Sequence, residues 1–200
     1  MKQNNNWQWY ISKPNFFTSD ECDEFVDKIK STEKKEFGCL EPHQGEDHVP
    51  EFRHVSEWYL HKDMRDYVVG DYSDLQQKLY IAAKVCNQLS WNLNIQEVEN
   101  NIKLIEYTPG DFYTWHSDFN SGISSTRKLV TIIQLSDPKD YEGGSIQLAI
   151  QDPENLEFYE MVKEKGTLIV FPPICFHRVT PVTKGVRYSL QEFILGDTFV

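Results

Sequence analysis

The sequence predicts a mostly β fold, a jelly roll with flanking helices packed on one of its sheets. Seven short runs rich in Val, Ile, Phe and Tyr occupy the second half of the chain. Turn signals such as Pro109-Gly110 and Gly143-Gly144 separate these runs. Two amphipathic helical patterns precede them. Short strands at this spacing favour a sandwich or jelly roll over a parallel sheet with crossover helices.

The first helix is expected to begin after Thr18 and to run to about Lys30. Thr18 and Glu21 have the spacing of a capping box, in which each side chain accepts from the backbone N–H of the other residue. Apolar residues then recur at helical spacing and predict the buried face: Cys22, Phe25, Val26 and Ile29.

The second helix is expected to open near Ser73. One apolar stripe follows it along four turns: Leu75, Leu79, Ala82, Cys86 and Leu89. Between the helices, residues 36–57 are polar and broken by Gly and Pro, which predicts a long loop. Two interpretations of residues 36–72 stay open, strands that flank the barrel or a lid.

The strands are expected in the second half of the chain. The candidate runs are residues 100–108, 126–136, 144–150, 156–162, 166–171, 174–180 and 186–195. No stretch resembles a linker between two domains. We therefore expect one domain over residues 1–200, with helical support in about 1–97 and the jelly-roll core in about 98–195.

The charge balance and the cysteines point to an acidic cytoplasmic protein. Lys and Arg number 20 against 31 Asp and Glu, a formal net charge of −11, so we expect no nucleic-acid partner. No apolar run approaches the roughly 18 residues of a membrane span, and no secretory leader is visible, so we expect no membrane partner. The cysteines are scattered and predict reduced thiols: Cys22, Cys39, Cys86 and Cys175.

Two segments carry candidate metal ligands. His116 and Asp118 lie two positions apart, so both side chains reach the same side of an extended chain. Two His and one carboxylate on one face of an octahedron suit non-haem Fe(II). Taken alone, the pair is more typical of a solvated surface. His177 lies in the apolar stretch 171–179 and, taken alone, is more typical of a core or strand-end histidine.

Arg187 is the second residue of the last predicted strand. The alternation of side chains along this strand allows two interpretations of where Arg187 points. One face carries Arg187, Ser189 and Gln191, and the other carries Tyr188, Leu190 and Ile194. Simple alternation sends Arg187 to solvent. The opposite holds if the strand lines a hollow barrel that encloses a polar ligand. Alternation alone leaves both open.

In combination, these segments resemble the Fe(II)- and 2-oxoglutarate-dependent oxygenases, specifically the prolyl 4-hydroxylase branch and its PKHD-type relatives. Residues 107–118 match the pattern Y-x-x-G-x-x-Y-x-x-H-x-D. Further matching segments follow in the order of that branch: residues 127–138, the double-glycine turn 141–144, residues 166–172 and residues 177–188. The resemblance covers about residues 98–195 and implies a double-stranded β-helix, the cupin-like jelly roll.

The resemblance implies three cofactors or cosubstrates, namely Fe(II), 2-oxoglutarate and O2, with ascorbate as an optional reductant. His116, Asp118 and His177 match the iron ligands. The presence of Asp118 favours hydroxylation, because halogenating relatives leave that carboxylate out. Arg187 matches the residue that anchors the distal carboxylate of 2-oxoglutarate.

Supporting roles follow from the same resemblance. Tyr107, Gln134 and Ser189 are candidates for contact with 2-oxoglutarate, each weighed equally against barrel packing. Some relatives carry tyrosine at the position of Gln134, which puts its role in doubt. The residues that match the mouth of the pocket, and so the substrate, are Tyr113, Arg127 and Trp115. For Trp115, core or rim packing is the favoured alternative.

The function implied is hydroxylation of an unactivated C–H bond, with succinate and CO2 as co-products. The favoured substrate is a prolyl or other residue in a peptide or protein. The alternative is a free amino acid or small metabolite. A nucleic-acid demethylase is disfavoured, because the second arginine of that branch is replaced by Phe193. A jelly-roll binding module without turnover is disfavoured by the intact ligand set.

Overall fold

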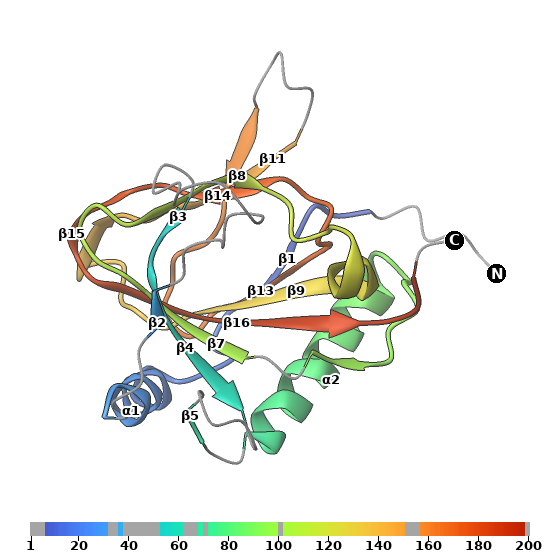
Figure 1. The fold of residues 1–200 in the computed structure, drawn as a ribbon, viewed down its shortest axis with the longest axis horizontal. Coiled ribbons are helices and arrows are strands. Elements are labelled where there is room, and N and C mark those ends of the chain that lie inside the picture. The colour runs from blue at the N-terminus through green and yellow to red at the C-terminus, as the bar shows by residue number, and fades with distance from the viewer. Residues whose placement is uncertain are drawn as a thin grey trace.

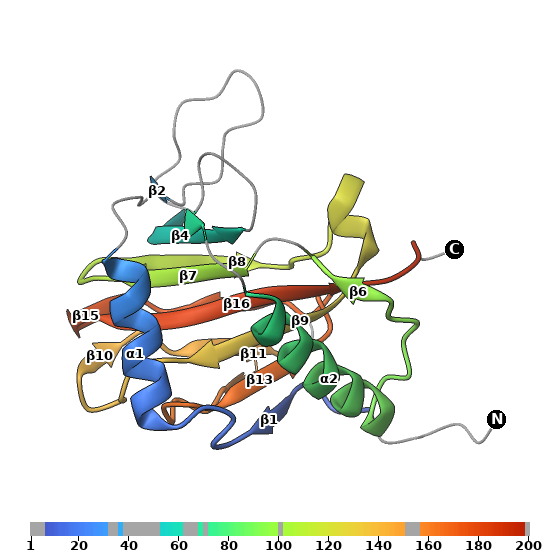
Figure 2. The ribbon, with the colours of Figure 1, turned by 90° about the horizontal axis from the view of Figure 1, so that it is seen from below.

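The computed structural model describes residues 7–31, 36–37, 53–61, 68–69, 72–99, 102–150 and 157–198. Two main β-sheets form the body of the molecule, and two α-helices cover the outer face of the larger sheet (Figure 1). Figure 2 shows both helices lying across that face. The predicted mostly β jelly roll with N-terminal helices on one sheet is confirmed.

The larger sheet has nine strands and is built around β16 (Arg187–Leu195). Its order is β1 (Ile11–Lys13), β13 (Leu168–Phe171), β9 (Arg127–Gln134), β16, β7 (Ile102–Tyr107), β4 (Ser56–His61) and β2 (Glu36–Phe37). β5 (Val68–Val69) pairs with β4, and β6 (Glu97–Val98) pairs with β16. β16 runs antiparallel to both β9 and β7, which places Ser189 opposite Gln134 and Arg187 opposite Tyr107.

The smaller sheet has five strands and faces the first across the interior. Its order is β12 (Phe158–Glu160), β11 (Ile146–Ala149), β14 (His177–Val179), β8 (Phe112–His116) and β3 (Arg53–His54). A separate pair, β10 (Tyr141–Gly143) and β15 (Val182–Gly185), forms a two-stranded sheet. The N-terminal part of the chain therefore contributes strands to both sheets as well as helices.

Helix α1 (Ser19–Lys30) begins and ends as the sequence predicts. Thr18 Oγ1 accepts from the backbone N–H of Glu21 at 3.2 Å, and Glu21 Oε2 accepts from that of Thr18 at 2.7 Å. Helix α2 (Ser73–Leu89) lies beside it. Both bury an apolar face on one side of the larger sheet, where they meet residues such as Leu104 and Leu190.

The second core lies between the sheets and follows from alternation along the strands. On β7, Leu104 belongs to the core under the helices, whereas Ile105 and Tyr107 belong to the core between the sheets. On β16, Leu190 and Ile194 face the helices, and Arg187, Ser189 and Gln191 line an interior cavity. The barrel-lining interpretation of Arg187 is therefore correct, and the solvent interpretation is wrong.

The predicted stripe of α2 is wrong at its last position. Leu89 is 58% exposed, although Leu79, Ala82 and Cys86 are buried as expected. The helix ends at Leu89. At this end of the helix the buried residues are Asn87, in its last turn, and Trp91, which follows the helix. The side-chain amide of Asn87 donates to the carbonyl of Leu93 and accepts from the N–H of Leu93. These two hydrogen bonds stabilise the segment that follows the helix.

The predicted loop over residues 36–57 is wrong at both ends. Residues 36–37 form β2, residues 53–54 form β3, and Ser56 begins β4; residues 38–52 lie outside the described part. The polar residues of this segment indicated a solvated loop. Two of them, Arg53 and Glu57, are instead buried in the strands as an ion pair. For β3 and β4, the alternative of strands flanking the barrel is confirmed.

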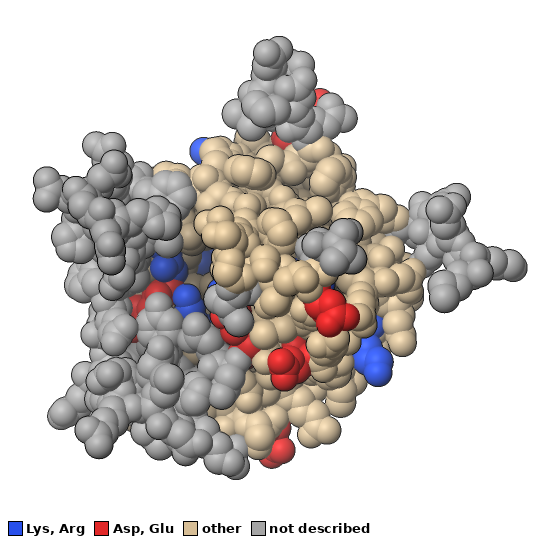
Figure 3. All heavy atoms as spheres, turned by 45° about the vertical axis from the view of Figure 1, so that its right-hand side comes forward, with Lys and Arg blue, Asp and Glu red and all other residues tan. Residues whose placement is uncertain are grey.

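The surface view and the thiols concern the expected charge and redox state. On the face in Figure 3 most of the described surface belongs to uncharged residues, and several acidic groups have no basic group beside them. Cys22, Cys86 and Cys175 are free and buried, and Cys39 lies outside the described residues. Among the residues described, no helix is long and apolar enough to cross a bilayer. The cytoplasmic location stays a prediction.

Candidate active site

Three side chains that could hold a metal converge at one end of the interior cavity. His116 ends β8, Asp118 follows two residues later, and His177 begins β14. His116 Nε2 lies 3.8 Å from Asp118 Oδ1, and His177 Nε2 lies 3.4 Å from Asp118 Oδ2. One ligand atom from each residue lies within 4.8 Å of the others. We call these three residues the metal cluster.

A β-bulge brings the metal cluster together. His116 pairs with His177 and Tyr113 pairs with Val179, so three steps along β8 match two along β14. The extra residue puts Tyr113 and His116 on the same inward face, where their rings stack with centroids 3.5 Å apart. Trp115 lies on the outer side, with the Arg178 guanidinium 4.8 Å from its ring centroid.

Backbone carbonyls fix both imidazoles in the orientation that a metal ligand needs. His116 Nδ1 lies 2.7 Å from the carbonyl oxygen of Thr114, and His177 Nδ1 lies 3.0 Å from that of Cys175. A carbonyl can only accept, so each Nδ1 carries the proton and each Nε2 presents its lone pair to the cluster. Burial, assisted by His177, lowers the pKa of His116 to about 2, which keeps this imidazole neutral.

The donor set fits a divalent transition metal. Ligands about 2.1 Å from one ion lie roughly 3–4 Å from one another, which is the spacing of the closest approaches here. Asp118 Oδ2 is buried and has no hydrogen-bond partner among the described residues. A bound cation would remove the cost of leaving this carboxylate oxygen unpaired. Two imidazoles and one carboxylate are the set suited to non-haem Fe(II).

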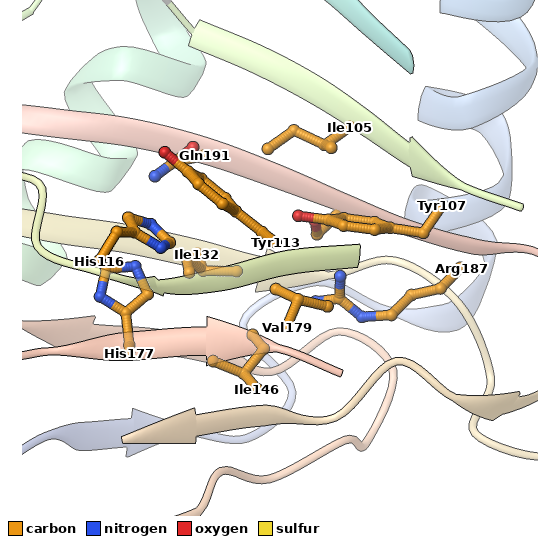
Figure 4. Close-up of a pocket in the computed structure, with 11 residues that line it drawn as sticks. Ile105, Tyr107, Tyr113, His116, Ile132, Ile146, His177, Val179, Arg187 and Gln191 are labelled. Carbon is orange, nitrogen blue, oxygen red and sulfur yellow. The ribbon is translucent and has the colours of Figure 1, made fainter. Parts of the chain in front are cut away.

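The opposite end of the cavity is closed by a buried guanidinium. Arg187 is 1% exposed and points inward from β16. Its Nη2 donates to Gln134 Oε1 at 2.9 Å, and its Cζ lies 5.1 Å from the Tyr107 ring centroid. Nε and Nη1 are buried and have no hydrogen-bond partner in the described part of the chain. Figure 4 shows Arg187 and Tyr107 at one end and the two histidines at the other.

The cavity between these two ends has mainly apolar walls with a few polar groups. Its lining residues are Ile105, Tyr107, Tyr113, His116, Ile132, Ile146, His177, Val179, Arg187, Ser189 and Gln191. Such a site can hold an anion at the arginine end and bring the rest of that ligand to a metal at the histidine end. The arrangement suits a small dicarboxylate.

The structure brings most of the predicted site residues to this cavity. Tyr107, Ser189 and Tyr113 line it. Gln134 contacts the guanidinium of Arg187 through its side-chain oxygen, and its nitrogen donates to the carbonyl of Val162 at 2.9 Å. Trp115 is not among the lining residues and packs on the outside of the smaller sheet.

Arg127 lies next to the metal cluster but already has partners. It forms an ion pair with Glu99 at 2.8 Å, and its Cζ lies 3.7 Å from the Phe193 ring centroid. Its Nη1 donates to the backbone carbonyl of Asp118 at 3.3 Å. These contacts support the backbone that carries one ligand of the metal cluster, in addition to the predicted place at the mouth.

Sequence reasoning missed a buried charged group beside the metal cluster. Arg53, from β3, forms a buried ion pair with Glu57, and its Cζ lies 4.6 Å from the Tyr113 ring centroid. Tyr113 therefore lies between Arg53 and His116. No signal in the sequence identifies this pair, because both residues come from a polar stretch far from the motif.

Comparisons with known proteins agree with this geometry. Residues 102–195 match the family model described as the 2OG-Fe(II) oxygenase superfamily. Over 89 residues the chain is 35% identical to a PKHD-type hydroxylase of Pseudomonas aeruginosa, a match that covers 42% of this chain and 38% of that protein. The chain spans about half the length, or less, of the curated relatives it matches.

Solved structures show the same fold over nearly the whole chain. A Pseudomonas putida prolyl-4-hydroxylase aligns with a TM-score of 0.69 at 15% identity, covering 94% of this chain and 93% of that one. A Trichoplax adhaerens prolyl hydroxylase, in complex with a hypoxia inducible factor oxygen degradation domain peptide fragment, aligns with a TM-score of 0.72 at 19% identity. That alignment covers 96% of this chain and 85% of the other.

Proposed function

Since the chain carries a 2OG-Fe(II) oxygenase domain in residues 102–195, we propose that it is an Fe(II)- and 2-oxoglutarate-dependent hydroxylase. One observation carries the proposal: the metal cluster and the buried Arg187 occupy the two ends of a single cavity. Each end has buried polar atoms without hydrogen-bond partners among the described residues, Asp118 Oδ2 at one and Arg187 Nε and Nη1 at the other. These are the groups that Fe(II) and a dicarboxylate would satisfy.

At the metal end, the chain supplies three ligands in fixed orientations. His116 and His177 would bind iron through Nε2, since Nδ1 of each is held by a backbone carbonyl. Asp118 would bind through a carboxylate oxygen. Bound iron supplies the activation of O2 that leads to hydroxylation of a C–H bond, with succinate and CO2 as co-products. Ascorbate, as an optional reductant, stays a prediction.

At the closed end, Arg187 would anchor the distal carboxylate of 2-oxoglutarate. Gln134 positions this guanidinium by accepting from Nη2, and Tyr107 packs against its face. Ser189 follows Arg187 by two residues on β16 and lies opposite Gln134 on β9. It lines the same cavity, so its hydroxyl can reach the same ligand. The apolar residues between the ends exclude water from the space between the carboxylate and the metal.

We propose a prolyl or other residue within a peptide or protein as the substrate. The peptide complex of the Trichoplax adhaerens relative supports this choice, as does the branch of the family that the motifs resemble. Tyr113 is the lining residue best placed to meet the substrate, because it lines the cavity next to His116. A free amino acid is the second candidate.

The test is a coupled turnover assay. The Fe(II)-loaded chain is incubated with 2-oxoglutarate, O2 and either prolyl peptides or free amino acids, and succinate and substrate mass are followed. We expect succinate release that depends on a peptide, together with the gain of one oxygen atom by that peptide. Gain of oxygen by free amino acids alone would replace the peptide proposal with the second candidate. If neither prolyl peptides nor free amino acids stimulate succinate release, both substrate candidates are contradicted.

A further inference from the structure

A second buried polar group, Tyr141, lies beside Arg187 just behind the lining of the closed end of the cavity. Tyr141, on β10, is 5% exposed, and its hydroxyl is buried without a hydrogen-bond partner among the described residues. Leaving a buried hydroxyl unpaired lowers the stability of a folded protein. Such a group calls for an explanation, and a ligand is one that the surroundings support.

Packing places this phenol beside Arg187. Both side chains lie against Gly144, whose φ of +57° favours glycine. A Cβ at Gly144 would lie 3.0 Å from Cδ of Arg187 and 3.3 Å from Cε2 of Tyr141, so the glycine leaves room for both. The ring also lies near Lys163, whose Nζ is 5.7 Å from the centroid and donates to the carbonyl of Gly143.

Arg187 is the main charge acting on the hydroxyl and favours an anion, against smaller opposing effects of Asp137 and Glu164. Burial raises the pKa of Tyr141 and Arg187 opposes the rise, so the phenol stays protonated and can donate. Two guanidinium nitrogens next to it, Nε and Nη1 of Arg187, also lack partners. The remaining nitrogen, Nη2, is bonded to Gln134, whose amide nitrogen is in turn bonded to Val162. Among the described residues, the polar atoms without partners on these two neighbouring side chains are therefore all able to donate.

We infer that Tyr141 is a cosubstrate-binding residue, whose hydroxyl donates to the distal carboxylate of 2-oxoglutarate alongside Nε and Nη1 of Arg187. A carboxylate offers about four acceptor sites on two oxygens, enough for these donors. Gln134 then acts as a positioning residue that directs the guanidinium toward them. The inference rests on the proposed function, and it assigns a role to a residue that the motif alignment placed only within the double-glycine turn.

The inference predicts opposite effects of Tyr141→Phe on the free and the bound protein. Without ligand, the variant loses an unpaired buried hydroxyl, so its melting temperature should stay the same or rise by a few degrees. With ligand, it loses a hydrogen bond to a charged group, so the dissociation constant of 2-oxoglutarate should rise at least about tenfold. A merely structural role would lower the melting temperature and the affinity together.

The experiment is calorimetric titration of the anaerobic Fe(II)-loaded protein with 2-oxoglutarate and, separately, with 2-oxobutyrate, which lacks the distal carboxylate. We expect Tyr141→Phe to weaken 2-oxoglutarate and to leave 2-oxobutyrate unchanged. The matched control is Tyr188→Phe, which removes a phenol on the opposite face of β16 that donates to Glu106 at 2.7 Å. This control should leave both affinities unchanged.

Three outcomes would overturn the inference. Equal affinity of wild type and Tyr141→Phe for 2-oxoglutarate would show that the hydroxyl does not contact it, and the proposed function would stand. Equal weakening of both oxoacids would assign Tyr141 to the fold. Failure of the wild-type protein to bind 2-oxoglutarate at all, with iron bound, would reject the proposed function together with the inference.

Discussion

The two ends of the cavity are held in place in different ways. At the metal end, two paired strands of the smaller sheet, β8 and β14, contribute the histidines. A backbone carbonyl two residues before each histidine orients its ring. At the closed end, a single guanidinium is held by side chains from other strands, with Gln134 from β9 and Tyr107 from β7. Short-range backbone contacts thus orient the histidine rings at one end, and long-range side-chain contacts hold the guanidinium at the other.

This difference has a functional consequence. The orientation of the two histidine rings depends on the local turn and bulge, so it should tolerate changes at the closed end of the cavity. The orientation of Arg187 depends on several residues that are distant in sequence, so it should be sensitive to each of them. Substitutions at the two ends should therefore affect different ligands, and each prediction below tests that separation.

The largest effect is expected at the metal end. Asp118→Ala removes one of three ligands, so Fe(II) affinity should fall by about 100-fold or more and turnover should be lost. The fold should be retained, because the variant also removes a buried carboxylate oxygen that has no hydrogen-bond partner. Metal titration followed by circular dichroism checks both points.

Asp137→Ala is the matched control for this substitution. Its carboxylate accepts from the backbone N–H of Lys139 in a turn outside the cavity lining, so Fe(II) affinity should not change. Full Fe(II) affinity of the Asp118→Ala variant would reject the metal cluster.

The next effect is expected at the closed end. Arg187→Ala should raise the dissociation constant of 2-oxoglutarate by about 100-fold, because a buried charge pair loses its cation. Fe(II) affinity should change by less than about twofold, because Arg187 lies at the far end of the cavity. Calorimetry with each ligand separates the two effects. Parallel loss of both affinities would contradict the separation of the two ends.

A separate effect, on stability rather than on ligand binding, concerns a buried carboxyl that belongs to neither end. Burial raises the pKa of Glu192 to about 9, so its folded state holds a proton that the unfolded state releases above about pH 4.5. Stability should therefore fall as pH rises from about 5 to 9. Glu192→Gln should raise the free energy of unfolding by about 3 kcal/mol at pH 7 and flatten this dependence.

Denaturant unfolding across this pH range measures the Glu192 effect, with Glu142→Gln as the control. Glu142 forms an exposed ion pair with Lys184, so its substitution should leave the pH dependence in place. Ligand affinities should be unchanged in Glu192→Gln, because Glu192 shares the helix-facing side of β16 with Leu190 and Ile194 and contacts Gln76 of α2. A stability profile identical to wild type would contradict the buried, protonated state.

The smallest effect is expected from the support of the metal cluster. Arg127→Gln removes the donor to the carbonyl of Asp118, so Fe(II) affinity should fall by about three- to tenfold while 2-oxoglutarate anchoring is spared. Arg178→Gln is the control, because Arg178 lies on the outer face of the smaller sheet against Trp115. Equal effects of the two variants would show that Arg127 acts only through general stability.

The metal end was predictable from the sequence because its signal is local. His116 and Asp118 lie two positions apart, and the motif around them fixes their spacing. The same sequence did not predict β8 as one of the seven strands, since its five residues include the bulge that places Tyr113 and His116 on one face. The motif therefore indicated the ligands without indicating the backbone irregularity that brings them together.

The closed end was less predictable because its contacts join distant segments. Alternation left two orientations for Arg187, and only closure of the barrel decides between them. The sequence placed Tyr141 in a double-glycine turn but gave no sign that its hydroxyl lies beside Arg187. Arg53 and Glu57 were assigned to a loop, because polarity usually indicates solvent and their mutual pairing cannot be seen in one sequence.

The account depends most directly on one cavity that binds iron at the histidines and a dicarboxylate at Arg187. The measurement that tests it is the anaerobic visible spectrum of the Fe(II)-loaded protein during titration with 2-oxoglutarate. We expect a metal-to-ligand charge-transfer band in the wild type, no band in Asp118→Ala, and a band in Arg187→Ala only at much higher 2-oxoglutarate. Bound iron without a band in the wild type, or an unchanged titration in Arg187→Ala, would contradict the account.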